Sequence, residues 1–350
     1  MNLKASYCSY DLIFKRPSGT SRGVLKTKET WYIKLEQGNQ WGIGECGILR
    51  GLSYDDLPNY EEKIKWACQH IHIGKETLVE ELKQYPSIVF GLEQAFKSLE
   101  SKDPFLLFDS EFTNVESPVK INGLIWMGSI DFMKQQIDEK LRAGISCIKI
   151  KVGALDFERE LELVKYLREQ SLSVEIRLDA NGGFNPQNAL ERINRLSEYQ
   201  IHSIEQPLNP EFKEELAMLS RLSPIPIALD ESLIGVLDQD EQVVLLKTIK
   251  PQYIILKPSF VGGFKASSKW IQLAESMNIG WWITSALESN IGLNAIAQWT
   301  STLNSTLPQG LGTGALYTNN IESPLSIDKD LLYYRKSLYW DMDKIESLCI

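Results

Sequence analysis

Charged residues recur at the ends of short apolar segments through the middle of this chain. The residues that close these segments are Lys151, Asp179, Glu205, Asp230 and Lys257, and neighbours along the chain lie about 25 to 28 residues apart. That interval is the length of one strand plus one helix, so it predicts equivalent positions on successive βα units. Because parallel strands end at the same edge, we expect these side chains to form one ring.

Alternating strand and helix patterns fill residues 113–315. The pattern predicts strands at 119–126, 147–152, 174–179, 201–205, 225–230, 253–257, 280–285 and 309–312. Amphipathic helices are predicted between them at 131–143, 157–170, 186–199, 211–222, 240–248 and 264–277. Eight such strands favour an α/β fold, a modified (β/α)₈ barrel of the TIM type. The alternative is an open doubly wound sheet, but no Gly-x-Gly-x-x-Gly fingerprint opens any of its strand–helix turns.

Residues 1–112 have a different, α+β pattern and are expected to form a separate domain. A strand is predicted at 7–14, a hairpin around Gly38-Asn39, and helices at 61–70, 77–84 and 87–102. Two loops rich in turn-forming residues, 16–23 and 47–58, are candidate lids over a site elsewhere in the molecule. Their candidate contact residues are Arg16, Ser18, Gly19, Arg22, Arg50 and Tyr54.

The three acids of this ring indicate a metal site. Asp179, Glu205 and Asp230 would repel one another if packed together without a cation, and Mg²⁺ prefers carboxylate oxygens. A single acid at a strand end is as readily a helix cap or an ion-pair partner, but three at matched spacing favour a metal site. Strand alternation turns the next residue, Glu231, away from Asp230, where it can support the ligand from behind or pack in the barrel.

Lysines flank these acids on both sides. Lys149 and Lys151 are two residues apart and therefore both face the barrel interior, while Lys257 approaches from the far side. A lysine buried near a metal and other cations can accept a proton near neutral pH. We therefore expect a site in which a lysine removes a proton next to a carboxylate and Mg²⁺ stabilises the resulting enediolate.

Composition excludes several other functions. The 350-residue chain has a net charge of −9 and no Lys/Arg run longer than a pair, which argues against nucleic acid and anionic membranes as partners. No stretch of about 18 apolar residues or signal-peptide pattern is found, so we expect no membrane span or export. Five cysteines without a CxxC spacing indicate reduced thiols in a cytoplasm, and neither a disulfide frame nor a zinc site.

The order of the motifs carries a resemblance to a known family. Lys149-Ile150-Lys151, Asp179-Ala180-Asn181, Glu205-Gln206-Pro207, Asp230-Glu231-Ser232 and Lys257-Pro258 resemble the enolase superfamily, in its muconate lactonizing enzyme-like branch. The resemblance implies that residues 1–112 are a capping domain with two lid loops, and that residues 316–350 return to it. It also implies Mg²⁺, with Mn²⁺ as an alternative, on Asp179, Glu205 and Asp230.

The same resemblance assigns the remaining roles. Lys151 would be the base, Lys149 would lower the pKa of Lys151, and Lys257 would stabilise the anion as a cation. Arg177, Asn181 and Glu231 would support the ligands from behind.

The residues after the last two strands bear on the substrate, a small carboxylate. Epimerases of this branch that act on dipeptides carry an Asp-x-Asp pair where this chain has Gly312-Thr313-Gly314, so a substrate with a free ammonium group is disfavoured. Small glycines leave room for an anionic group near backbone N–H donors. Candidate substrate contacts are Ser285, Glu288, Ser289, Gly312 and Thr313.

This pattern is most similar to a dehydratase of the branch. The reaction implied is loss of water from 2-succinyl-6-hydroxy-2,4-cyclohexadiene-1-carboxylate, which makes the ring aromatic. A racemase of N-acylamino acids, a cycloisomerase of the same branch, and a non-catalytic binding barrel are the alternatives.

Overall fold

The computed structural model describes residues 3–20 and 23–349. Its N-terminal part is an antiparallel sheet in the order β1 (Lys4–Thr20), β2 (Gly23–Gln37) and β3 (Gln40–Cys46). Three helices pack beside it, namely α1 (Tyr60–Gln69), α2 (Lys75–Glu81) and α3 (Pro86–Glu100). We call β1–β3 with α1–α3 the cap. The backbones of β3 and α3 come very close, since a Cβ added at Gly44 would lie 1.9 Å from the carbonyl oxygen of Gly91, so only glycine fits there.

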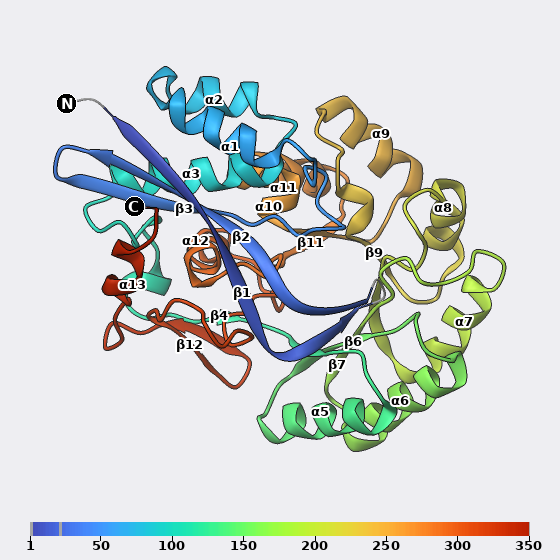
Figure 1. The fold of residues 1–350 in the computed structure, drawn as a ribbon. Helices are drawn as coiled ribbons and strands as arrows, with labels where there is room; N and C mark the ends of the chain where they lie inside the picture. The colour runs from blue at the N-terminus through green and yellow to red at the C-terminus, as the bar shows by residue number, and fades with distance from the viewer. Residues whose placement is uncertain (1–2, 21–22, 350) are drawn as a thin grey trace.

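The cap confirms one local prediction and corrects another. β2 and β3 pair as a hairpin around Gly38-Asn39, with Gln37 opposite Gln40, as the turn residues predict. Residues 16–20 are not a loop, however. After a register shift between Ile13 and Ser18, pairing resumes with Ser18 opposite Leu25. The expected loop is therefore the end of a long hairpin that reaches from the cap toward β6 and β7 (Figure 1).

The second part contains a seven-stranded sheet in the order β11-β10-β9-β8-β7-β6-β5, and the pairs along it are parallel. The strands are β5 (Gly123–Ile125), β6 (Cys147–Lys151), β7 (Glu175–Asp179), β8 (Ile201–Glu205), β9 (Ile227–Leu229), β10 (Tyr253–Leu256) and β11 (Gly280–Ile283). The helices between them lie within about three residues of their predicted starts and ends. They are α5 (Ile130–Arg142), α6 (Phe157–Gln170), α7 (Ala189–Leu196), α8 (Lys213–Leu222), α9 (Gln239–Ile249) and α11 (Gly263–Ser276). Helices α5 to α9 form an arc outside the strands (Figure 1), which confirms the modified TIM-type barrel.

The barrel closes without the eighth strand that the sequence predicts at 309–312. Single parallel bridges join Gln309 to Ile121 and Gly310 to Thr284. The side chain of Gln309 replaces part of the missing ladder, because its Oε1 accepts a hydrogen bond of 2.7 Å from the Ile283 N–H. The strand predicted at 119–126 is also divided, into β4 (Val119–Lys120) and β5, and β4 pairs outside the barrel sheet.

Several elements carry no sequence prediction. They are α4 (Glu111–Asn114), α10 (Pro258–Val261), α12 (Asn290–Ser301), β12 (Leu325–Asp328), β13 (Leu331–Tyr334) and α13 (Met342–Glu346). β12 and β13 form a small sheet with β4. Beyond them, Ile345 and Leu348 pack in one cluster with Tyr32 and Ile43 of the cap.

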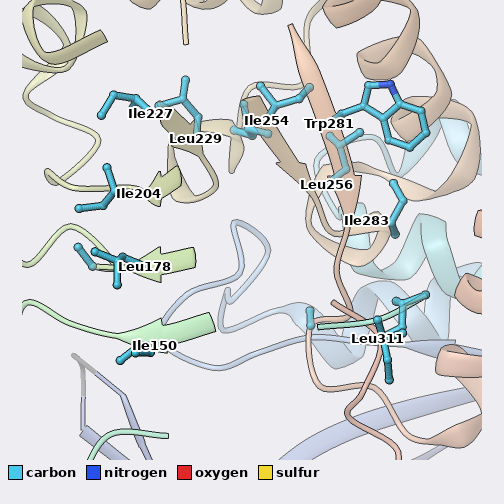
Figure 2. Packing of buried hydrophobic residues seen from close by; sticks show 14 of the residues in the cluster. Ile150, Leu178, Ile204, Ile227, Leu229, Ile254, Leu256, Trp281, Ile283 and Leu311 are labelled. Carbon is cyan, nitrogen blue, oxygen red and sulfur yellow. The ribbon is translucent and has the colours of Figure 1, made fainter. Parts of the chain in front are cut away.

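Apolar side chains fill the layer between the barrel strands and their helices. Ile150, Leu178 and Ile204 lie on successive strands in Figure 2 and are fully buried. Each stands one position before the charged residue that ends its strand, so the charged residue points to the opposite face. The apolar core thereby holds the charged ring inside the barrel mouth.

Two further sequence expectations concern the whole chain. The five cysteines are free thiols, although the Sγ atoms of Cys8 and Cys349 lie 2.8 Å apart. No helix within residues 3–20 and 23–349 is long and apolar enough to cross a membrane.

Candidate active site

Strand register brings the predicted ring together. Lys151 on β6 lies opposite Asp179 on β7, which in turn lies opposite Glu205 on β8. Asp230 and Lys257 directly follow β9 and β10. We call Lys149, Lys151, Asp179, Glu205, Asp230 and Lys257 the strand-end ring.

Each lysine of the ring is paired with an acid. Lys149 Nζ lies 2.9 Å from Glu205 and 3.2 Å from Asp179, and Lys151 Nζ lies 2.8 Å from Asp179. Lys257 is paired with Asp230. The side chains of the three acids are at most 2% exposed, so these ion pairs are shielded from water and much stronger than surface pairs.

The pairing decides the charge state of each group. Burial alone would raise the pKa of Asp179, but the ammonium groups of Lys149 and Lys151 outweigh it and lower that pKa. Glu205 behaves in the opposite way, because burial and the charge of Asp179 raise its pKa to about 8 despite Lys149. Burial would lower the pKa of Lys149, yet Asp179 and Glu205 outweigh it and raise that pKa. Lys149 is therefore a fixed positive charge in this arrangement.

The acids have the chemistry of a hard-cation site. Among the described residues, no three acidic, histidine or cysteine side chains are gathered closely enough to hold a metal as they stand. Lysine ammonium groups contact all three carboxylates instead. One oxygen is nonetheless left over, since Glu205 Oε1 is buried without a hydrogen-bond partner. Three buried carboxylates with an unsatisfied oxygen are a donor set that fits Mg²⁺.

A further set of hydrogen bonds holds Lys151 in place. Lys151 Nζ donates to Asn181 Oδ1 at 2.6 Å, and Asn181 Nδ2 donates to Glu231 Oε1 at 2.9 Å. Of the three predicted supporting residues, the structure thus places Asn181 against Lys151 and Glu231 against Asn181.

Sequence reasoning missed a further residue of this kind. Gln206 is fully buried, and its Oε1 accepts hydrogen bonds from the backbone N–H groups of Asp230 and Ser232 at 3.1 and 3.0 Å. It therefore shapes the turn that carries Asp230. Its backbone has a positive φ of 39°, which no sequence pattern of a glutamine would indicate.

Arg177 lies lower in the barrel than expected. Its guanidinium donates to Glu175 at 2.8 Å and to the Pro308 carbonyl at 2.9 Å, and it stacks over Trp282 at 4.3 Å. These partners lie away from the ring, because Arg177 precedes Asp179 by two positions on the same inward face. Its contacts are those of a core residue.

A cavity of about 790 Å³ opens over the ring and is lined by Lys149, Lys151, Asp179 and Lys257. Its far wall includes Ser285, Gly312 and Thr313, and Ser285 Oγ lies 2.6 Å from Thr313 Oγ1. A Cβ added at Gly312 would lie 3.4 Å from Ile121 Cδ1, which is ordinary van der Waals contact. Cavities of this volume are typical of small-molecule sites.

The predicted lid residues divide into two groups. Arg16 and Arg50 line the cavity, and Gly19 forms a bridge with Met127 that docks the hairpin end on the barrel. A Cβ at Gly19 would lie 2.5 Å from the Met127 carbonyl oxygen. Tyr54 is elsewhere, since its hydroxyl donates to Gln84 at 2.9 Å and its ring covers Gly235. Arg22 and the Ser18 side chain, which were also predicted to belong to the lids, lie outside the described residues.

Glu288 and Ser289 do not line the cavity, contrary to the sequence expectation. Both are fully buried, and Ser289 Oγ donates to Glu45 of the cap at 2.6 Å. The preceding residue, Leu287, has a positive φ of 66°, which turns the chain away from the cavity. The two residues therefore belong to the contact between cap and barrel.

Comparisons with known proteins identify the family. Residues 133–332 match the family described as enolase C-terminal domain-like, and residues 5–99 match the MenC N-terminal domain. The o-succinylbenzoate synthase of Desulfotalea psychrophila is 42% identical over 94% of this chain and 98% of its own. The crystal structure of MenC from that organism has a TM-score of 0.84 at 39% identity, and the match covers 95% of this chain and all of that one.

More distant structures share the fold. A dipeptide epimerase from Enterococcus faecalis, complexed with Mg and the dipeptide L-Leu-L-Tyr, has a TM-score of 0.84 at 22% identity, covering 95% of this chain and 97% of that one. The muconate lactonizing enzyme of Pseudomonas fluorescens has a TM-score of 0.82 at 21% identity, covering 99% and 98%. The chain therefore belongs to the enolase superfamily, in its muconate lactonizing enzyme branch, and within that branch to the o-succinylbenzoate synthase (MenC) family.

Proposed function

We propose that the protein is a hydro-lyase that converts 2-succinyl-6-hydroxy-2,4-cyclohexadiene-1-carboxylate to 2-succinylbenzoate, a step of menaquinone biosynthesis. The observation that carries the proposal is the 42% identity to the Desulfotalea psychrophila o-succinylbenzoate synthase over nearly the whole chain. The cavity above the strand-end ring supports it, because it presents lysines and carboxylates to a small carboxylate substrate.

Lys151 is the base in this proposal. Its Nζ in the neutral form takes the proton from the ring carbon that bears the carboxylate. The bond from the neighbouring carbon to the hydroxyl group then breaks, and the proton and the hydroxide together make up the water that is lost. Aromatisation of the ring supplies much of the driving force.

The other residues of the strand-end ring stabilise the negative charge that develops on the substrate carboxylate. Lys257 does so as a cation from the far side, and Lys149 keeps the interior positive beside Lys151. Asp179, Glu205 and Asp230 would hold Mg²⁺, or Mn²⁺ in its place, and the ion would supply further positive charge opposite that carboxylate.

The test is direct turnover. Purified protein with Mg²⁺ and the cyclohexadiene carboxylate should produce aromatic absorbance and one equivalent of 2-succinylbenzoate, and EDTA should stop the reaction. Absence of aromatic product with the metal-loaded protein would rule the proposal out.

A racemase of N-acylamino acids is the second candidate, because Lys151 and Lys257 both line the cavity and two bases are what racemisation needs. Incubation with an N-acylamino acid in D₂O separates the two functions. Deuterium exchange at the α-carbon without any dehydration of the cyclohexadiene carboxylate would favour the racemase.

We also infer that the enzyme works in the cytoplasm. Its five free thiols support this location, since reducing compartments keep cysteines unpaired.

A further inference from the structure

Buried polar side chains join the cap to the barrel beside the cavity but outside it. We call Lys28, Thr30, Glu45, Ser259, Glu288 and Ser289 the seam. All six are at most 3% exposed, and none lines the cavity. Burying polar groups is costly unless they are hydrogen-bonded.

Glu288 connects two segments that border the active site. Its Oε1 accepts a hydrogen bond from Ser259 Oγ at 2.6 Å, and its Oε2 accepts one from the Ala286 N–H at 2.6 Å. Ser259 follows Lys257 by two residues, and Ala286 is part of the cavity wall. One carboxylate therefore ties the chain after Lys257 to the wall opposite the ring.

The wall itself holds a strained residue. Leu287 lines the cavity and has a φ of 66°, a conformation that a leucine adopts only when its surroundings impose it. Tyr317 donates a hydrogen bond of 2.7 Å to the Leu287 carbonyl. The neighbouring bond from Ala286 to Glu288 fixes the peptide on the other side.

The cap fixes the far end of the same turn. Glu45 accepts hydrogen bonds from the Ser289 N–H at 2.8 Å and from the Gly292 N–H at 2.9 Å, at the start of α12. Thr30 of β2 donates to Glu45 at 2.7 Å. The 285–289 turn is thus held by Thr313 at its first residue and by the cap at its last.

We propose that Glu288, supported by Glu45, is a positioning residue that sets the cavity wall formed by Ser285, Ala286 and Leu287 and its distance from Lys257. The cap then contributes to turnover without a seam residue touching the substrate. This inference rests on the proposed dehydration, because the position of the wall is tested through KM for that reaction.

The experiment compares two substitutions of the same residue. Glu288→Ala removes both hydrogen bonds, so KM for the cyclohexadiene carboxylate should rise about tenfold or more, with a smaller fall in kcat. Glu288→Gln keeps both, because its carbonyl oxygen accepts from Ala286 and its amide N–H group donates to Ser259 Oγ. The glutamine variant should therefore keep KM within about twofold of wild type.

Glu93 offers a matched control. It also joins cap to barrel, since Glu93 Oε2 on α3 accepts hydrogen bonds from the Phe264 and Lys265 N–H groups at 2.5 and 3.4 Å. It does not line the cavity. Glu93→Ala should lower the melting temperature but leave KM unchanged, which separates positioning of the wall from general stabilisation.

Three outcomes would overturn the inference. One is a folded Glu288→Ala protein with wild-type KM, and another is a Glu93→Ala protein with the same rise in KM. If Glu288→Ala does not fold, Tyr317→Phe replaces it, and an unchanged KM in that variant is the third. Wild-type protein without dehydration activity would instead overturn the proposed function, and this inference with it.

Discussion

The acids of the strand-end ring and those of the seam are equally buried but are held by different partners. Asp179 and Asp230 face lysine ammonium groups, whereas Glu45 and Glu288 accept hydrogen bonds from hydroxyl and backbone N–H groups. The single lysine of the seam, Lys28, is buried without a hydrogen-bond partner. In this protein the acids with charged partners lie in the ring over which the cavity opens, while those with neutral partners hold backbone N–H groups in place.

The difference is visible in their pKa values. Lysines lower the pKa of Asp179, whereas burial raises the pKa of Glu288 with only a partial counter-effect from Lys28. Burial likewise lowers the pKa of Lys28 in spite of Glu45 and Glu288. Burial outweighs the nearby charges at Lys28 and Glu288. At Lys149, Asp179 and Lys257 the nearby charges outweigh burial.

Removal of divalent cations should have the largest effect if the ring acids are metal ligands. We expect EDTA to abolish dehydration and excess Mg²⁺ to restore it, because loss of the cation removes several kcal/mol of charge stabilisation, or about 10³-fold in rate. Melting temperatures recorded with and without Mg²⁺ provide a readout independent of turnover. Full activity after exhaustive chelation would mean that the lysines alone neutralise the ring.

Substitution of the ring lysines comes next. Lys151→Ala should lower kcat by roughly 10³-fold, because the proton acceptor is lost. Lys257→Ala should cost less, about 10²-fold, because only a stabilising charge is removed. Stopped assays of aromatic product measure both, with the exposed Lys165→Ala as control, and equal losses in the two variants would point to two bases.

The pH dependence of stability tests the acids with neutral partners. Asp55 in the cap is such an acid, since its Oδ2 accepts from the Ser87 N–H at 2.9 Å and from Ser87 Oγ at 2.6 Å. Burial raises its pKa to about 6 in spite of these bonds. A raised pKa in the folded state stabilises the protein at low pH, and that contribution disappears as the pH rises through about 6.

We therefore expect Asp55→Asn to flatten the pH dependence of unfolding between about pH 4 and 6. The variant should lack a contribution to the free energy of unfolding on the order of 2 to 3 kcal/mol, which corresponds to a shift of roughly two pKa units. Urea unfolding of wild type and variant across this range measures it. Parallel curves for the two proteins would show that Asp55 ionises normally.

Substitution of Arg50 should have the smallest effect on stability and turnover. It lines the cavity but is partly exposed and paired with Glu29 and Asp56 at 2.5 and 2.8 Å. Arg50→Ala should change stability by about 1 kcal/mol or less, since exposed ion pairs contribute little, and should raise KM a few-fold if the 47–58 loop contacts the substrate. An unchanged KM would remove this loop from the site.

The regular spacing of the strand–helix units explains why the strand-end ring could be predicted from the sequence and the seam could not. Lys151, Asp179 and Glu205 each end a strand, and the strand-plus-helix repeat is written in the local pattern of apolar residues. Glu288 also follows a strand, so it was expected in the cavity. The left-handed backbone at Leu287 moves it to the seam, and nothing in a leucine residue indicates that conformation.

The prediction of a strand in the closing segment of the barrel was wrong for a similar reason. An apolar pattern predicted a strand at 309–312, but Gln309 uses its side chain to satisfy the Ile283 N–H. Gln206 does the same for Asp230 and Ser232. A buried glutamine that replaces backbone pairing has no periodic signature, so only the assembled structure reveals it.

The sequence by itself determined the barrel, the order of the charged residues and the face on which they lie, because strand alternation and unit length are local properties of the chain. Only the tertiary structure decided which lysine meets which acid, how the barrel closes and what the cap holds. Those choices depend on residues far apart in the chain, such as Glu45 and Ser289, which are separated by 244 positions. No local pattern of residues specifies a contact at that separation.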